Sequence, residues 1–324
     1  MKKDKIRVSV IGVGHLGEYH VQKYKVHPDV DLVGIVDTNK DRANEIGQRY
    51  NVKVFGNHKE ILGKVDAVSL AIPTESHFDV AKDILAEGVH LLIEKPITYM
   101  LEPADTLIRM AGEKGVILQV GLVERYNPAI VRMESMLKQP LFIEAHRMNK
   151  FTIRGTDVDV VLDLMIHDLD IILHIVPSEV KEIHAVGMSV ITGKTDIANV
   201  RLIFENGAVA NLTASRVSEK IIRKIRVFQP NAYLHADCYK REFTITRLDN
   251  GAGDLSNLPD LKTEKETFPG RDPLADQIDF FIKSVIKGPG PVTRERDERK
   301  ALKIAIDVIN LIHEGCNRFK PANN

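Results

Sequence analysis

The stretch from Ile6 to Gly17 decides the fold of the first part of the chain and reads IRVSVIGVGHLG. Its first half is a run of alternating and then continuous apolar residues, typical of a strand buried on both faces. Its second half is the pattern GxGxxG, at Gly12, Gly14 and Gly17. A helix is predicted next, and a second β-branched strand then ends at Asp37. Strand, glycine loop, helix, second strand and terminal acid, in this order, predict a dinucleotide-binding unit.

Each residue of the glycine loop has a physical role in such a site. Gly12 permits a tight turn, and Gly14 removes a side chain where a pyrophosphate approaches the backbone. Gly17 lets the helix pack closely on the strand. The helix N-terminus at His15 and Leu16 offers backbone N–H groups and a partial positive charge to the phosphates.

Asp37 indicates which nicotinamide cofactor the site takes. Its carboxylate is placed to accept hydrogen bonds from the adenosine ribose hydroxyls. The same negative charge would repel a 2′-phosphate, so we expect NAD rather than NADP. Lys40 and Arg42 lie just downstream and soften this preference.

Composition excludes several other classes of protein. At 324 residues the chain is long enough for two domains with buried cores. Lys plus Arg equals Asp plus Glu at 45 each, so net charge gives no case for nucleic acid or an anionic membrane. Cys238 and Cys316 form no CxxC pair, so we expect neither a structural zinc site nor a disulfide framework. With no signal-peptide core and no apolar run of membrane-spanning length, a cytoplasmic location is expected.

The order of predicted elements divides the chain in two. Strands and helices alternate through residues 1–123, which predicts a doubly wound parallel sheet, an α/β Rossmann domain that binds NAD. Residues 124–324 are predicted to form an α+β domain for substrate binding and oligomerisation, with a large, mostly antiparallel open sheet. Residues 249–271 read as a loop, followed by helices over 272–286 and 294–314. Helices precede and follow the strands, so we expect them to cover one sheet face. The other face is either free to pair with a second subunit or polar and solvated.

Glu94-Lys95-Pro96 is the first motif that suggests chemistry. It follows an apolar strand, and Pro96 biases Lys95 away from the helical region. Lys95 is thereby expected at the carboxyl edge of the sheet, near a nicotinamide. An amine there can hydrogen-bond a substrate hydroxyl and stabilise its developing alkoxide character. The alternative is a surface lysine in a turn, or one paired with Glu94.

The second motif is the pair Asp163 and His167 in a heavily apolar predicted helix over 160–176. Their i, i+4 spacing places them on one helix face, where Asp163 can orient one imidazole nitrogen and leave the other as a proton acceptor. A satisfied core histidine is the alternative. His174 raises the question of a metal site, but the helical rise keeps it over about 15 Å from Asp163, so no metal is expected.

These motifs resemble one family. GVGHLGEYH, AIPTESHFDVAKDILAEGVHLLIEKPIT and DLMIHDLD, spread over nearly the whole chain, are similar to the Gfo/Idh/MocA oxidoreductases. The resemblance implies oxidation of a sugar or polyol hydroxyl by a nicotinamide cofactor, and homodimers or homotetramers formed through the C-terminal sheet. It also implies that Lys95 and His167 are the acid–base pair, with Asp163 supporting His167. The residues it places around the cofactor are Pro73, Thr74, His77, Glu94 and Lys95.

Within that family, the segment GLVERYNPA and the stretch GTDVDVVLDLMIHDLD resemble UDP-N-acetylglucosamine 3-dehydrogenases. The resemblance implies a nucleotide-sugar substrate in contact with Lys95, Arg125, Tyr126, Asn127, Arg154, Asp163 and His167. Tyr126 stands where such proteins more usually have Phe. A UDP-sugar needs cations for its diphosphate, and the candidates are Arg125, Arg147, Lys150 and Arg154. A solvated rim of charge is the alternative.

The resulting hypothesis is an NAD(P)-dependent dehydrogenase acting on CH–OH groups, with C3 of UDP-N-acetylglucosamine as the expected position. His167, oriented by Asp163, accepts the hydroxyl proton, and Lys95 hydrogen-bonds the same oxygen. A dehydrogenase of a free polyol or sugar, such as inositol or glucose, is the alternative. A non-catalytic NAD(H) sensor is a further one, and it needs neither Lys95 nor the Asp163–His167 pair.

Overall fold

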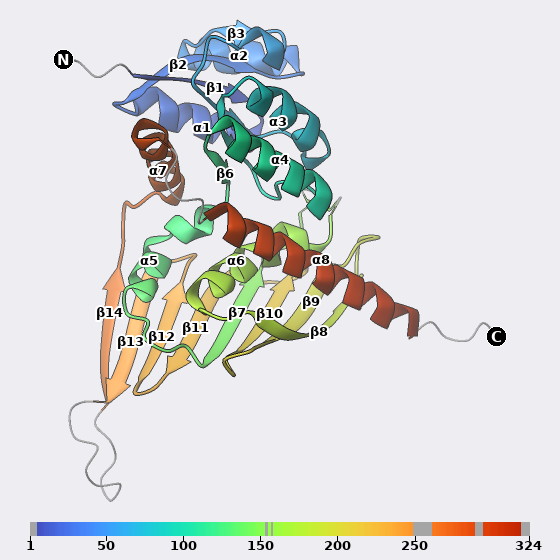
Figure 1. Ribbon diagram of the computed structural model, residues 1–324. Helices are drawn as coiled ribbons and strands as arrows, with labels where there is room; N and C mark the ends of the chain where they lie inside the picture. The colour runs from blue at the N-terminus through green and yellow to red at the C-terminus, as the bar shows by residue number, and fades with distance from the viewer. Residues whose placement is uncertain (1–4, 153–154, 157, 249–260, 289–293, 319–324) are drawn as a thin grey trace, which may run out of the picture. The chain divides into compact units, whose positions relative to one another are not determined.

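The computed structural model describes residues 5–152, 155–156, 158–248, 261–288 and 294–318 (Figure 1). The chain divides into two compact units. The first comprises Met1–Val123 and Asp272–Arg299, and the second Glu124–Arg271 and Lys300–Asn324. The sequence predicted a second domain over all of 124–324. Residues 272–299 belong to the first unit instead, which corrects that boundary.

The first unit contains a six-stranded sheet in the order β3-β2-β1-β4-β5-β6, and every pairing in it is parallel. This is the doubly wound order, which reverses direction between β1 and β4. The predicted Rossmann fold is confirmed. Its strands are β1 (Ile6–Ile11), β2 (Val30–Val36), β3 (Val54–Phe55), β4 (Ala67–Leu70), β5 (His90–Ile93) and β6 (Leu118–Val120).

Four helices and two short 3-10 turns lie between these strands in the sequence, and a fifth helix, α7 (Pro273–Lys287), follows much later in the chain. The four helices are α1 (His15–Val26), α2 (Lys40–Tyr50), α3 (His77–Ala86) and α4 (Leu101–Lys114), and the 3-10 turns are His58–Glu60 and Thr74–Ser76.

α7 belongs to the first unit because its apolar stripe packs into that core. Ile278, Phe281 and Ile282 are fully buried and join one cluster with Val10 of β1 and Tyr24 of α1. Such burial stabilises a fold by roughly 1.5–3 kcal/mol for each large apolar side chain. The order of elements along the sequence does not indicate that a helix near the C-terminus packs on the first sheet.

The second unit contains an eight-stranded sheet in the order β14-β13-β12-β11-β7-β10-β9-β8. Among the described strands of this sheet only β7 and β10 pair in parallel, so the predicted mostly antiparallel sheet is confirmed. The strands are β7 (Phe142–Met148), β8 (Val180–Met188), β9 (Ile197–Phe204), β10 (Val209–Ser215), β11 (Ile222–Gln229), β12 (Ala232–Asp237), β13 (Glu242–Leu248) and β14 (Leu261–Thr267).

β14 corrects the predicted loop over 249–271, whose residues 249–260 lie outside the described part of the chain. The strand reads LKTEKET, and most of its residues are exposed. The strand has no alternation of apolar and polar residues from which it could be predicted. Charged side chains on an edge strand hinder its pairing with other chains.

Helices lie against one face of the eight-stranded sheet (Figure 1). They are a 3-10 turn (Val123–Tyr126), α5 (Pro128–Glu134), a π-helical turn (Val161–Met165), α6 (Ile166–Ile175) and the part of α8 (Arg294–Arg318) that belongs to this unit. α8 contacts β8 closely, since a Cβ built on Gly187 would lie 2.9 Å from Cδ1 of Ile312.

The opposite face of this sheet is mostly polar. Cross-strand pairs include Glu144–Arg226 at 3.1 Å and Lys265–Glu242 at 3.0 Å. An aromatic row crosses its middle, where the rings of Phe142, Phe228, Tyr233 and His235 follow one another at centroid distances of 5.6, 4.9 and 6.4 Å. Within the described residues, no helix has both the length and the apolar character needed to cross a bilayer.

Candidate active site

The glycine loop has the geometry that the sequence predicted. Gly12 has φ +82°, and a Cβ on it would lie 2.4 Å from the carbonyl oxygen of Ala71. A Cβ on Gly17 would lie 1.8 Å from the carbonyl oxygen of Gly12, so helix and loop are in direct contact. Around Gly14 there is open space, since no atom lies within 4 Å of the corresponding position. No side chain caps α1 at Gly14, which leaves its first N–H groups facing this space. The loop therefore fits a dinucleotide pyrophosphate.

Asp37 lies at the end of β2 and holds the glycine loop. Its Oδ2 accepts a 2.7 Å hydrogen bond from the backbone N–H of Val13, and Oδ1 accepts one of 2.8 Å from the N–H of Asn39. A carboxylate has about four acceptor positions, so about two remain for ribose hydroxyls.

Arg42 is occupied by internal contacts. Its Nε donates to the carbonyl oxygen of Val13 at 3.0 Å, and its other nitrogens pair with Glu18 and Glu45. The carboxylates of Glu45 and Glu18 raise the pKa of Arg42. The expectation that Arg42 softens the cofactor preference is therefore not supported by the position of its guanidinium.

Pro73, Thr74 and His77 follow the carboxyl end of β4. Pro73 is exposed and Thr74 is half-buried, but His77 is only 1% exposed. Its Nδ1 lies 3.0 Å from the carbonyl oxygen of Pro96, and its Nε2 lies 2.9 Å from that of Ile72. Burial lowers the pKa of His77, while the carbonyl contacts act in the opposite direction. The imidazole lies beneath the surface, which argues against the predicted contact of this side chain with the cofactor.

Glu94 and Lys95 follow the carboxyl end of β5. Lys95 is half-buried, and its peptide bond to Pro96 is cis. Glu94 is 8% exposed, and its Oε1 lies 3.1 Å from Nε2 of the buried His20. A Cβ on Gly121 would lie 2.6 Å from the same carboxylate oxygen. Glu94 is thus held on the protein side of the turn.

His20 is a buried neighbour of Glu94 that was not among the predicted site residues. It lies on the buried side of α1 with Gly17, Val21 and Tyr24, and its Nδ1 lies 2.6 Å from Oγ of Ser69. The available signal was a histidine in an apolar helical stripe, opposite a serine in the otherwise apolar strand β4.

In the second unit, Asp163 and His167 are both half-buried. Asp163 lies in the π-helical turn Val161–Met165 and His167 in the first turn of α6. The predicted helix over 160–176 therefore starts with a π-helical turn, so the i, i+4 spacing of the two residues does not place them on one face of a regular α-helix. The backbone of Gly155 lies against Asp163, since a Cβ there would be 2.8 Å from Oδ2. Single π turns inside helices occur frequently at functional sites.

Two predicted diphosphate ligands belong to buried ion pairs. Arg125 is bonded through Nε and Nη2 to Asp170, and its side chain is only 8% exposed. Arg147 lies between Asp168, at 2.6 Å, and Glu124, at 3.1 Å. Burial opposes ionisation of Arg147, but Asp168 and Glu124 raise its pKa. Buried pairs of this kind are costly to break, which argues against the predicted contacts of both arginines with a diphosphate.

The remaining predicted substrate residues differ in their environments. Tyr126 is half-buried and Lys150 is exposed, whereas Arg154 lies outside the described residues. Asn127 is a buried helix cap: its Oδ1 accepts the N–H of Ala129, and its Nδ2 donates to the carbonyl oxygen of Cys238 at 2.9 Å. These bonds and its burial argue against the predicted contact of Asn127 with substrate.

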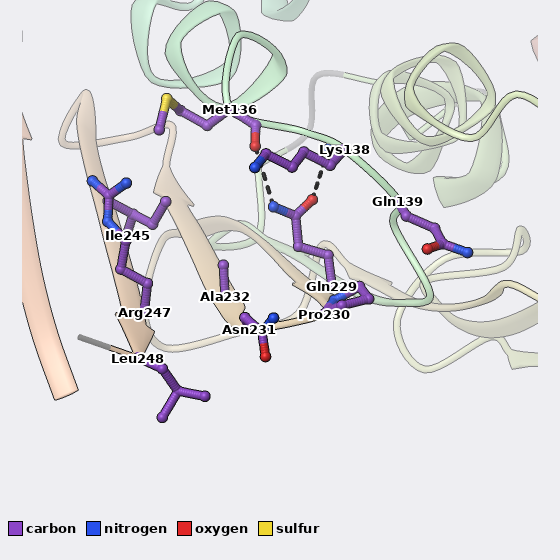
Figure 2. Close-up of a pocket in the computed structure, with 10 residues that line it drawn as sticks. All are labelled: Met136, Lys138, Gln139, Gln229, Pro230, Asn231, Ala232, Ile245, Arg247 and Leu248. Carbon is purple, nitrogen blue, oxygen red and sulfur yellow. Dashed lines mark hydrogen bonds between the residues drawn. The ribbon is translucent and has the colours of Figure 1, made fainter. Parts of the chain in front are cut away.

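A separate pocket of about 370 Å³ lies near the turn between β11 and β12. Figure 2 shows the amide of Gln229 bonded to the backbone of Met136 and of Lys138. Arg247 in its wall is paired with Glu264 at 2.7 Å. None of the described residues that line it is a predicted site residue.

Comparisons with known proteins agree with the two-domain fold. Residues 6–122 match the family described as oxidoreductase family, NAD-binding Rossmann fold, and residues 129–229 match the GFO/IDH/MocA C-terminal domain. The UDP-N-acetylglucosamine 3-dehydrogenase of Acidithiobacillus ferrooxidans is 39% identical over 281 residues, which are 86% of this chain and 88% of that protein. A solved structure of that enzyme, GnnA, has a TM-score of 0.88 at 36% identity, covering 96% of this chain and 99% of the other.

More distant relatives extend the comparison. Myo-inositol 2-dehydrogenase of Thermotoga maritima is 26% identical over 317 residues, which are 92% of this chain and 93% of that protein. The structure of GenD2 in complex with NAD shares the fold, with a TM-score of 0.83 at 19% identity over 97% of this chain and 96% of that chain.

The chain belongs to the Gfo/Idh/MocA family of oxidoreductases. It is an NAD(P)-dependent dehydrogenase that acts on CH–OH groups, with an NAD-binding Rossmann domain.

Proposed function

We propose that this dehydrogenase oxidises the C3 hydroxyl of UDP-N-acetylglucosamine to the 3-keto sugar, with NAD rather than NADP as cofactor. The observation that carries the proposal is the 39% identity to a UDP-N-acetylglucosamine 3-dehydrogenase across most of both chains. Asp37 supports the choice of NAD, because a 2′-phosphate would meet its carboxylate while Arg42 is occupied by Glu18 and Glu45.

The proposed chemistry assigns one task to each of three side chains. His167 accepts the proton of the sugar hydroxyl, and Asp163 orients its imidazole. Lys95 hydrogen-bonds the same oxygen and stabilises the negative charge that develops on it. NAD, when bound, accepts the hydride. Gly14, Thr74 and the N-terminus of α1 bind and orient the cofactor.

The substrate diphosphate needs cations other than the two buried arginines. Lys150 follows β7, is exposed and is one candidate. Arg154 lies outside the described residues and stays a predicted diphosphate ligand. Tyr126, half-buried, is a further candidate for substrate contact.

A free polyol or sugar is the second candidate substrate, and the 26% identity to a myo-inositol 2-dehydrogenase favours it. Purified protein is mixed with NAD and a panel of UDP-sugars, free sugars and inositols, and NADH absorbance is followed. The proposal expects turnover with UDP-N-acetylglucosamine and competitive inhibition by UDP. Turnover of inositol that is indifferent to UDP would support the alternative.

Lys95→Met tests the assigned chemistry. We expect turnover to fall by about 10³-fold, in the range of positioned acid–base groups, while NADH affinity changes by less than about threefold. Near-normal turnover in this variant would remove Lys95 from the mechanism. Binding of NADH without turnover of any substrate by the unaltered protein would favour the sensor.

Two further expectations stay proposals. A homodimer or homotetramer is proposed to form through the open face of the eight-stranded sheet, supported by the aromatic row of Phe142, Phe228, Tyr233 and His235. Light scattering of Phe228→Lys should then show a smaller particle than the unaltered protein. A cytoplasmic location is also proposed, on the sequence features given above.

A further inference from the structure

We propose that His20 and His77 are positioning residues for Lys95, buried side chains that hold the residues on either side of the lysine close to strand β4 and to the segment that follows it. The inference rests on the proposed function, because it assumes that Lys95 meets the reacting hydroxyl. It assigns a role to two histidines that do not themselves reach the substrate.

The residue before Lys95 is held through His20. The Nε2 of His20 lies 3.1 Å from Oε1 of Glu94, and its Nδ1 lies 2.6 Å from Oγ of Ser69 on β4. His20 is fully buried, and the backbone N–H of Glu94 donates to the carbonyl oxygen of Leu70. The backbone of Glu94 is therefore bonded to β4, and its carboxylate lies within ion-pair distance of a histidine that contacts the same strand.

The residue after Lys95 is held through His77. Its Nδ1 lies 3.0 Å from the carbonyl oxygen of Pro96 and 3.3 Å from that of Ile97. Its Nε2 lies 2.9 Å from the carbonyl oxygen of Ile72, directly beyond β4. The imidazole of His77 thus lies between the turn that carries Lys95 and the segment that leaves β4.

This arrangement matters because a lysine side chain is a flexible four-carbon stem. The position of its amine is only as well defined as the backbone from which the stem starts. Misplacement of a catalytic group by about 1 Å can cost about 10²-fold in rate. Buried contacts that carry no chemistry themselves can therefore control turnover.

The main test compares His77→Leu with a conservative His77→Asn, whose amide can still donate to the carbonyl oxygen of Pro96. His20→Leu tests the other side of the turn. The matched control is His90→Gln, at the opposite end of β5, where Nδ1 of His90 accepts the N–H of Ile117 at 2.9 Å. The control removes a comparable histidine contact from the same sheet.

Two readouts are used: steady-state kinetics with NADH titration, and backbone hydrogen exchange over residues 94–99 by mass spectrometry. For His77→Leu and His20→Leu we expect faster exchange over 94–99 and a loss of about 10- to 100-fold in kcat, with NADH Kd within about twofold. His77→Asn should recover most of both effects. His90→Gln should keep the kcat and the exchange pattern even where its melting temperature falls equally.

The proposal is overturned if His77→Leu folds and keeps both kcat and slow exchange, or if His90→Gln loses as much kcat. It is also overturned if NADH affinity falls in parallel with kcat, because His77 would then act through the cofactor. Failure of the proposed function looks different: Lys95→Met would keep its turnover, whatever the exchange data show.

Discussion

The carboxylate of Asp37, at the end of β2, accepts a 2.7 Å hydrogen bond from the backbone N–H of Val13 in the glycine loop. Asp37, which is proposed to bind the cofactor ribose, therefore also stabilises the loop that is proposed to bind the pyrophosphate. Loss of its charge and loss of its acceptor oxygens have separate consequences.

Asp37→Asn and Asp37→Ala separate these two roles. The amide introduced by Asp37→Asn retains an oxygen for the N–H of Val13 but lacks the charge that repels a 2′-phosphate, so NADPH affinity should rise and NADH affinity should fall moderately. Asp37→Ala also removes the brace, and NADH affinity should fall by about tenfold or more, in line with about 1.5–3 kcal/mol for hydrogen bonds to charged groups. Fluorescence titration with both cofactors measures this. Equal NADH affinity in all three proteins would remove Asp37 from the site.

Gly17 and Gly14 should respond differently when each is replaced by alanine. Gly17→Ala places a Cβ 1.8 Å from the carbonyl oxygen of Gly12, whereas Gly14→Ala meets no atom within 4 Å. We expect Gly17→Ala to destabilise the fold by about 3 kcal/mol, as overpacking does, and Gly14→Ala to fold normally but bind NADH weakly. Thermal unfolding and NADH titration check both. Normal cofactor binding by Gly14→Ala would place the pyrophosphate elsewhere.

Gly155 gives an indirect test of Asp163. It has φ +78°, and a Cβ there would lie 2.8 Å from Oδ2 of Asp163. Gly155→Ala should displace this carboxylate and lower kcat by about 10- to 100-fold with little change in NADH affinity. Gly193→Ala is the matched control, since that position is open and its φ is not in the left-handed region. Equal kcat in the two variants would count against the role of Asp163.

Asp196 should make the second unit sensitive to acid. Burial opposes its ionisation, but hydrogen bonds from the hydroxyl of Thr192 and the N–H groups of Ile191, Thr192 and Val190 lower its pKa. A carboxyl with a depressed pKa in the folded state stabilises the fold above its unfolded pKa of about 3.9, and this stabilisation is lost as the pH falls further.

Asp196→Asn should accordingly lower the melting temperature at pH 7. Its difference from the unaltered protein should narrow progressively below about pH 4. Scanning calorimetry across that range gives the comparison, and a constant difference at every pH would exclude a contribution from the charge.

Much of the first sheet was predictable because its signals are local. The glycine loop, its following helix and Asp37 lie within one βαβ unit, where spacing in the sequence determines spacing in the fold. The open antiparallel sheet was predictable for the same reason, since hairpins join neighbouring strands.

The misplaced site residues have a different cause. Arg125 and Arg147 carry the charge that a diphosphate needs, but their partners Asp170 and Asp168 come from a distant helix, so only the folded chain shows that they are already paired. His77 was predicted to contact the cofactor because it follows the end of β4. In the fold its imidazole is buried and contacts backbone carbonyl oxygens instead.

The return of residues 272–299 to the first unit also bears on how this protein is made. On the ribosome, β1 to β6 emerge long before Phe281 and Ile282, whose side chains complete their core. The nascent strands of the first unit therefore expose an apolar surface until the whole eight-stranded sheet has been synthesised. A gene truncated after codon 123 should yield insoluble or protease-sensitive material, even though it encodes every strand of the Rossmann sheet.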